Sequence, residues 1–166
     1  MDWREFLTIV LPKQGRIGVR AVNFNGVDPD KDTWIRRYND FDDIEKFLED
    51  VENAKRESYF NPATFGWGNN CKKPNIAFIK SFYLDLDCGT GERKQFASQA
   101  DGIAALKNFC IAVGMPTPMI VLSGNGVHVY WVLDEAITRE VWEPYQAGLI
   151  ELAEKHGLPS DDATKK

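Results

Sequence analysis

The sequence predicts an α/β (α+β) fold whose second half is a split βαβ, or ferredoxin-like, unit. Apolar and polar side chains alternate from Phe82 to Asp87, as they do in an extended strand. Further along the chain, two stretches with apolar residues at helical spacing are separated by two short runs rich in β-branched and aromatic residues. An extended segment follows the second helical stretch, so the predicted order is β-α-β-β-α-β.

Each helix of this unit has a local signal at its ends. Ser98 is a good N-cap for the first helix, and Gly114 is expected to end it. Thr138 is expected to cap the second helix, and Gly157 to close it. The strands are predicted at residues 78–87, 119–122 and 127–133, and the helices at about 98–113 and 138–156. The side chains predicted to face the core from the second helix are Val141, Tyr145, Leu149 and Leu152.

The first half is predicted to contain further strands and one helix. The strands are indicated by β-branched and aromatic residues, and Asp40 is expected to cap the helix, whose outward face is acidic. The expected order is a strand at 6–11, a hairpin turn at 12–15, a strand at 16–24, a polar loop at 25–33, a helix at about 41–55, and a short strand with an aromatic-rich loop within 57–70.

Length and composition indicate a globular protein of one domain or of two closely packed modules, with 166 residues that are 43% apolar and 27% charged. No apolar run approaches the length of a membrane span and the start lacks a secretory layout, so no membrane partner is expected. Cys71, Cys88 and Cys110 are odd in number and widely spaced, which excludes a full disulfide framework and a CxxC zinc site. They indicate a reducing cytoplasm, with buried or half-buried thiols.

The net charge is −5, which counts against tight, autonomous binding of nucleic acid, since proteins that grip phosphate backbones usually have a basic surface. Many of the acidic residues lie between Asp40 and Glu52. Such a cluster is more typical of a solvated helix face than of a binding site. A basic cleft elsewhere stays compatible with the sequence, for instance around Lys72, Lys73, Lys80, Arg93 and Lys94.

Asp85 and Asp87 lie two residues apart, so their carboxylates project from the same side of the predicted strand. A polar strand end that runs into a turn is one explanation. The other is a divalent-metal site, because like charges this close repel unless a cation lies between them. Right-handed crossovers would order the strands 4-1-3-2 and bring this strand end beside His128 and beside the pair Asp161-Asp162.

The turn from Ser123 to His128 contains two glycines around Asn125. Gly124 and Gly126 allow positive φ values and a close approach of a ligand to the backbone, and the exposed N–H groups of such a turn can bind an anion. An Asn-Gly hairpin with an incidental histidine is the alternative. Beside an acid pair, phosphate binding is the favoured interpretation.

Two or three carboxylates beside a phosphate site fit nucleotidyl transfer with two divalent cations. No Walker-type Gly-x-x-x-x-Gly-Lys-Ser/Thr run is present, which argues against a P-loop NTPase. A Ser/His/Asp hydrolase is disfavoured because Ser123 is not on a strand-to-helix elbow.

Three motifs resemble the archaeo-eukaryotic primase (AEP) superfamily, and within it the primase-polymerases (PrimPols) of phages, plasmids and mobile elements. They are the acid-x-acid motif at 81–87, the Ser-x-His-type motif at 123–131 and the late Asp before Thr164. Residues 59–62 and 114–118 also resemble that family, so the similarity runs from about Tyr59 to the end.

The resemblance implies a single catalytic domain of the archaeo-eukaryotic primase fold, in which an N-terminal α/β module (1–77) packs on an RRM-like module (78–166). Asp85, Asp87 and a third acid would bind two Mg²⁺ or Mn²⁺ ions. The third acid would be Asp161 or Asp162, with Asp161 favoured for its spacing to Thr164. Ser123, Gly124, Asn125, Gly126 and His128 would lie against the phosphates of a dNTP or NTP, His128 most directly.

The implied activity is DNA-directed nucleotidyl transfer to a 3′-hydroxyl in phage or plasmid replication, in the bacterial host cytoplasm, on a single-stranded or primed DNA template. Family members usually continue past the third acid into a basic strand, whereas this sequence ends first. Either the C-terminal part was lost or, as we expect, the chain is the N-terminal fragment of a longer protein, with a helicase or priming domain in the same chain or in trans. Two rival functions remain open: a non-catalytic RRM-like initiator that binds single-stranded nucleic acid, and a metal-dependent nuclease.

Overall fold

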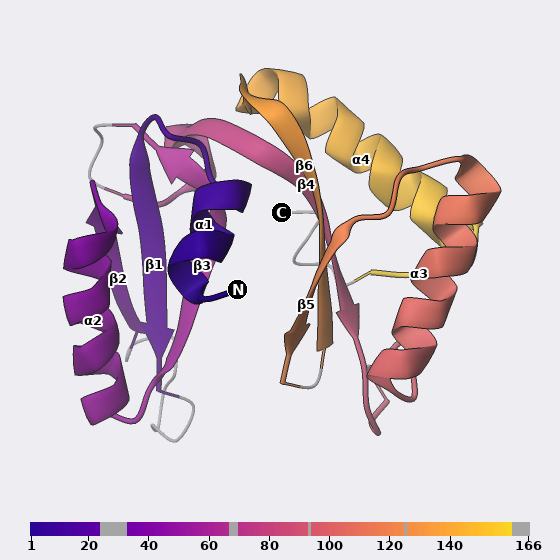
Figure 1. The fold of residues 1–166 in the computed structure, drawn as a ribbon, viewed down its shortest axis with the longest axis horizontal. Helices are drawn as coiled ribbons and strands as arrows, with labels where there is room; N and C mark the ends of the chain where they lie inside the picture. Colours follow the sequence, from indigo (N-terminus) through magenta and orange to yellow (C-terminus); the bar gives the residue numbers. More distant parts are fainter. Residues whose placement is uncertain (24–32, 67–69, 93, 125, 161–166) are drawn as a thin grey trace. The chain divides into compact units, whose positions relative to one another are not determined.

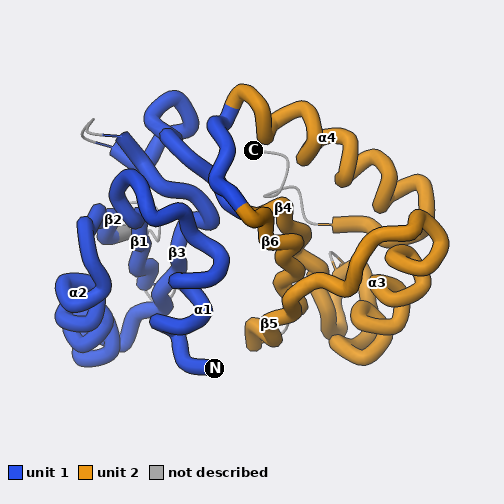
Figure 2. The backbone as a smooth tube through the Cα atoms, turned by 45° about the horizontal axis from the view of Figure 1, so that its top comes forward, with its two compact units in different colours: residues 1–80, 135–139 blue, residues 81–134, 140–166 orange. Residues whose placement is uncertain are grey.

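The computed structural model describes residues 1–23, 33–66, 70–92, 94–124 and 126–160, and has the mixed α/β architecture that the sequence predicts (Figure 1). Within these residues, six strands form one antiparallel sheet in the order β2-β1-β3-β4-β6-β5. The chain divides into two compact units, one of residues 1–80 and 135–139 and the other of residues 81–134 and 140–166 (Figure 2). The long strand β4 (Ile76–Asp87) begins in the first unit and ends in the second.

The first unit is organised around a central strand that has an antiparallel partner on each side. Strand β1 pairs with β2 along one edge and with β3 along the other, and β3 in turn pairs with the beginning of β4. The elements are α1 (Trp3–Val10), β1 (Arg16–Val22), β2 (Thr33–Tyr38), α2 (Phe41–Asn53) and β3 (Glu57–Phe65).

The prediction of a strand at residues 6–11 is wrong, because this segment forms the second part of helix α1 and its C-cap. Asp2 accepts a hydrogen bond from the backbone of Glu5, and the Glu5 side chain accepts one from the backbone of Asp2, which together form a capping box. Leu7 and Val10 are then buried one turn apart. Local capping and helical burial therefore outweigh the β propensity of the segment, and the predicted hairpin turn at 12–15 instead connects α1 to β1.

Strand β2 was missed, whereas helix α2 was predicted with its cap. The polar loop predicted at 25–33 lies almost wholly outside the described residues, and the strand that follows has two arginines in six residues, which obscures its alternation. Asp40 accepts a hydrogen bond from the backbone of Asp43 and so caps α2, whose buried residues are Ile44, Phe47 and Val51.

The second unit has the element order predicted from the sequence as far as the described residues reach. Its elements after β4 are α3 (Gln99–Val113), β5 (Met119–Ser123), β6 (Gly126–Thr138) and α4 (Arg139–Lys155). Strand β6 lies between β4 and β5, as expected for the third strand of a split βαβ unit. Ser98 caps α3, and Gly114 ends it in the left-handed conformation, both as predicted.

Helix α4 buries a different face from the one that the sequence predicts. Leu149 is buried as predicted, but Val141, Tyr145 and Leu152 are 49%, 67% and 36% exposed. The buried residues are Trp142, Gln146, Leu149, Ile150 and Ala153. The apolar pattern was misleading because the centre of the buried face is the polar residue Gln146.

Gln146 and Trp142 bind the backbone of β4. The Gln146 amide accepts a hydrogen bond from Tyr83 N at 3.2 Å and donates one to Tyr83 O at 2.6 Å, as a neighbouring strand would. Trp142 Nε1 donates to Ser81 O at 3.0 Å. Two side chains of α4 thus satisfy backbone groups of β4 between its pairing with β3 and its acidic end.

The three cysteines are free, with Cys88 and Cys110 buried and Cys71 half-buried, as predicted. Among the described residues, no helix combines the length and the apolar character that crossing a membrane would require.

We predict that Gln146→Leu lowers the free energy of unfolding by about 2 to 4 kcal/mol, because leucine leaves the N–H and C=O of Tyr83 buried without these partners. Urea unfolding followed by tryptophan fluorescence measures the change. Glu151→Leu on the exposed side of the same helix is the control and should stay within about 0.5 kcal/mol of the parent protein. Equal stability of the two variants would contradict the role assigned to Gln146.

Candidate active site

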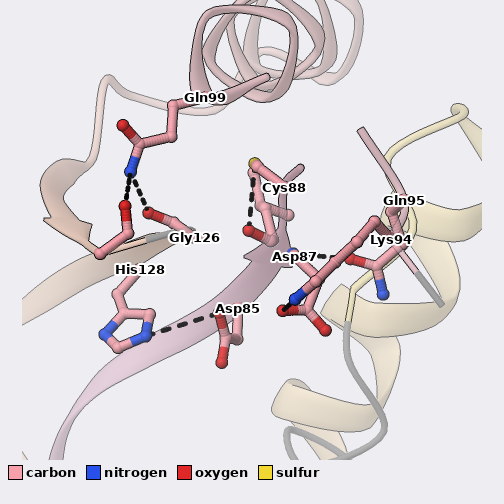
Figure 3. A network of polar contacts seen from close by, with 10 residues as sticks. Asp85, Asp87, Cys88, Lys94, Gln95, Gln99, Gly126 and His128 are labelled. Carbon is pink, nitrogen blue, oxygen red and sulfur yellow. Dashed lines mark hydrogen bonds and ion pairs between the residues drawn. The ribbon is translucent and has the colours of Figure 1, made fainter. Parts of the chain in front are cut away.

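The end of β4 presents two carboxylates on one face and apolar side chains on the other. Leu84 and Leu86 are buried in the core, 1% and 0% exposed. Asp85 and Asp87 alternate with them on the opposite face and are half-buried, with side-chain exposures of 34% and 32% (Figure 3). The two carboxylates therefore lie one strand repeat apart at the edge of the second unit.

His128 lies beside Asp85. Its Nε2 atom is 3.5 Å from Asp85 Oδ1, because β6 is the neighbour of β4 in the sheet and His128 is near the start of β6. Tyr83 and Tyr130, one strand repeat away from Asp85 and His128, have ring centroids 6.5 Å apart. Burial raises the pKa of Tyr83 to about 12 and raises that of Tyr130 as well, so both phenols stay neutral at physiological pH.

Asp87 is held by the loop that follows it. Lys94 Nζ donates a 2.8 Å hydrogen bond to Asp87 Oδ1 (Figure 3). The backbone N–H groups of Gln95 and Phe96 donate to Asp87 O at 3.0 and 3.1 Å, and Asp87 N donates to Gln95 Oε1 at 2.7 Å. The loop therefore folds back on the end of β4 and fixes both the backbone and the side chain of Asp87.

Lys94 is a site residue that sequence reasoning did not place. The sequence groups Lys94 with the basic residues of a possible cleft, and nothing in it indicates that the ammonium group would contact Asp87. The hydrogen bond to Asp87 raises the pKa of Lys94, and the charge of Asp85 adds to the effect. A cation thus lies against the acid pair, seven residues after Asp87 in the sequence.

The predicted phosphate-binding turn connects β5 to β6, and helix α3 holds it. Gln99 Nε2 donates to Gly124 O at 3.1 Å and to Gly126 O at 2.8 Å. Gly124 has a φ of +51°, which a glycine adopts without strain. Ser123 and Gly126 form the last pair of the two strands. Asn125 lies outside the described residues.

Gly126 brings the turn against the acid pair. A Cβ atom at this position would lie 3.2 Å from Leu86 O, 3.2 Å from Ser123 Oγ and 3.6 Å from Asp85 Oδ1. The Ser123 hydroxyl and the Asp85 carboxylate therefore face the same small space beside Gly126. A side chain at this position would press on its neighbours, so glycine is the residue that fits best there.

The third predicted metal ligand falls on residues that the structure does not describe. Asp161 and its alternative Asp162 lie outside the described residues, as does Arg93 of the possible basic cleft. Within the part of the chain that the structure describes, no group of three or more histidine, cysteine, aspartate or glutamate side chains could hold a metal ion. The observed cluster consists of Asp85, Asp87, His128, Ser123 and Lys94.

We predict that Gly126→Ala destabilises the protein by about 1 to 3 kcal/mol, because the new methyl group meets the backbone oxygen of Leu86, which cannot rotate away. Gly148→Ala is the matched control. A Cβ at Gly148 in helix α4 meets nothing within 4 Å, so this change should stabilise the protein by about 0.5 to 1 kcal/mol. Thermal unfolding of the two variants measures the difference, and changes of the same sign would contradict the close approach at Gly126.

No protein-family model matches the sequence, and no curated protein matches it. Solved structures that resemble it include the AEP domain of the primase-polymerase (PrimPol) of cyanophage S-2L, with a TM-score of 0.58, 18% identity, and coverage of 90% of this chain and 70% of that one. Another is the polymerase domain of ligase D from Mycobacterium tuberculosis in complex with DNA, with a TM-score of 0.47, 19% identity, and coverage of 90% and 60%. The structural match confirms the resemblance at the level of the fold: the chain has the fold of an AEP domain.

Proposed function

We propose that the protein is a DNA-directed nucleotidyltransferase, a primase-polymerase that adds nucleotides to a 3′-hydroxyl group in phage or plasmid DNA replication. The observation that carries this proposal is the contact of three separate segments. Asp85 on β4 lies beside His128 on β6, and Gly126 of the β5–β6 turn lies close to Asp85. Carboxylates can hold the divalent cations of nucleotidyl transfer, and a glycine turn and an imidazole can bind the phosphates of the nucleotide.

Asp85 and Asp87 would hold Mg²⁺ or Mn²⁺, with Asp161 as the third ligand of a two-ion site. The residues fit such ions, because carboxylate oxygens are the donors that hard divalent cations prefer and both side chains are accessible from one side. When bound, the ions would lower the pKa of the attacking 3′-hydroxyl and stabilise the leaving pyrophosphate.

The turn and His128 would position the triphosphate. Ser123 offers a hydroxyl, and the turn Gly124-Asn125-Gly126 offers backbone N–H groups. His128 offers an imidazole whose Nε2 atom lies 3.5 Å from Asp85 Oδ1. These groups carry no information about the base, so template pairing would select the incoming dNTP or NTP.

We further propose that residues 1–77 form an N-terminal α/β module and residues 78–166 an RRM-like module of one catalytic domain. The order β4-α3-β5-β6-α4 and the place of β6 between β4 and β5 support the second module. A net charge of −5 counts against autonomous DNA binding, so we propose that a further helicase or priming domain helps to hold the primed or single-stranded DNA template.

We predict that Asp85→Asn and Asp87→Asn each lower nucleotide incorporation into a primed DNA template by at least about 100-fold, because each removes a charged oxygen ligand at nearly constant volume. Primer extension with Mg²⁺ or Mn²⁺ and dNTPs measures the rate. Asp134→Asn makes the same change at an exposed position of β6 and should keep full activity.

The same assay separates the rival functions. A parent protein that binds single-stranded DNA and incorporates nothing would be a binding module. One that shortens the primer would be a nuclease. Incorporation that survives in the Asp85→Asn/Asp87→Asn double variant would refute the metal-site assignment.

We predict that His128→Gln raises the KM for the nucleotide about 10- to 100-fold, because it removes a hydrogen bond to a charged phosphate. Steady-state extension at varied dNTP concentration measures this effect. His156→Gln changes the other histidine, which is exposed and packs on Phe109, and should leave KM unchanged. An equal KM in the two variants would exclude His128 from the phosphate site.

A further inference from the structure

Lys94 is held against the acid pair by its own loop. The two residues after it are tied to Asp87 through their backbone N–H groups, and Gln95 Oε1 also accepts from Asp87 N. These hydrogen bonds place Lys94 directly before the point where the loop meets β4. Its ammonium group then reaches Asp87 Oδ1 at 2.8 Å (Figure 3).

The ammonium group is bound to a carboxylate oxygen that is a candidate ligand for a divalent cation. Asp87 Oδ1 cannot direct the same lone pair at Lys94 and at a cation, and two positive charges bound to one carboxylate repel each other. The negative charge of Asp85 also acts on Lys94, so the lysine balances part of the charge of both carboxylates. Part of the repulsion between the two carboxylates is therefore offset by a positive charge that belongs to the protein.

The contact is also easy to exchange. The side chains of Lys94 and Asp87 are each 32% exposed, and an ion pair with this access to water is weak. Lysine has a flexible four-carbon stem, so its ammonium can move several ångströms while the loop backbone stays tied to Asp87. A ligand with a more highly charged anionic group would bind the ammonium of Lys94 and so release the carboxylate of Asp87.

We propose that Lys94 is a positioning residue that competes with the divalent cation for Asp87 and moves to the triphosphate when the nucleotide binds. This inference rests on the proposed nucleotidyl transfer at the same site. Before the nucleotide arrives, Lys94 limits the repulsion between Asp85 and Asp87 and weakens cation binding. The nucleotide brings phosphate oxygens that pair with Lys94, and Asp87 becomes free for the cation. Cation binding is thereby made dependent on the nucleotide.

The test is Mn²⁺ binding, measured on the full chain by the EPR signal of free Mn²⁺, without DNA and with or without dATP. Each titration is compared with the same titration without protein, because dATP binds Mn²⁺ by itself. Lys94→Met should bind Mn²⁺ about 2- to 5-fold more tightly than the parent protein when dATP is absent, because the competing ion pair is gone. The increase in Mn²⁺ affinity on adding dATP should be smaller than in the parent. Lys94→Arg, which keeps the charge, should behave like the parent.

Lys107→Met is the matched control, because it removes the same charge from an exposed position of α3 and should leave Mn²⁺ affinity unchanged. A Lys94→Met variant that binds Mn²⁺ no better than the parent would overturn the inference, since a purely structural lysine would give unchanged or weaker binding. Asp87→Asn separates the two proposals. If it abolishes Mn²⁺ binding while Lys94→Met fails to tighten it, only the role of Lys94 is lost. If the parent protein binds no Mn²⁺ at all, the proposed function fails and the inference fails with it.

Discussion

The fold of the second unit depends on hydrogen-bond partners for the backbone groups along one edge of β4. Between its pairing with β3 and its acidic end, this strand has backbone groups that face helix α4 instead of another strand, and buried groups of this kind need partners. The amide of Gln146 and the indole of Trp142 supply them. The strand consequently stays extended through Tyr83, and the alternation that buries Leu84 and Leu86 also turns both carboxylates to one face.

The acid pair illustrates a second constraint, because two carboxylates at the end of a strand destabilise each other unless positive charge or hydrogen-bond donors lie nearby. Lys94 lies against one and His128 against the other. Both come from segments whose backbones are fixed independently, Lys94 from a loop tied to Asp87 and His128 from a strand paired with β5. The geometry of the cluster is therefore set by backbone hydrogen bonds, and the side chains within it remain accessible.

Much of this arrangement could be predicted from sequence because it rests on short-range signals. The alternation around Asp85, the caps at Asp40 and Ser98 and the glycine that ends α3 each depend on a few neighbouring residues. The failures have two physical causes. Helix α1 begins at a capping box between Asp2 and Glu5, a local signal that outweighs the β propensity of the segment. The face of α4 is set by a polar side chain that bonds to β4, and Lys94 contacts Asp87 because its loop folds back. These last two features depend on tertiary contacts that local patterns do not encode.

The contact between Gln99 and the carbonyls of Gly124 and Gly126 has a mechanical consequence. Gln99 is the first residue of α3, and that helix is anchored in the core by Leu106 and Phe109. The shape of the β5–β6 turn therefore depends on how helix α3 packs against the core. In a fold built this way, the volume of core side chains far from the turn helps to set the path of its backbone, so the proposed phosphate site would depend on the packing of the core.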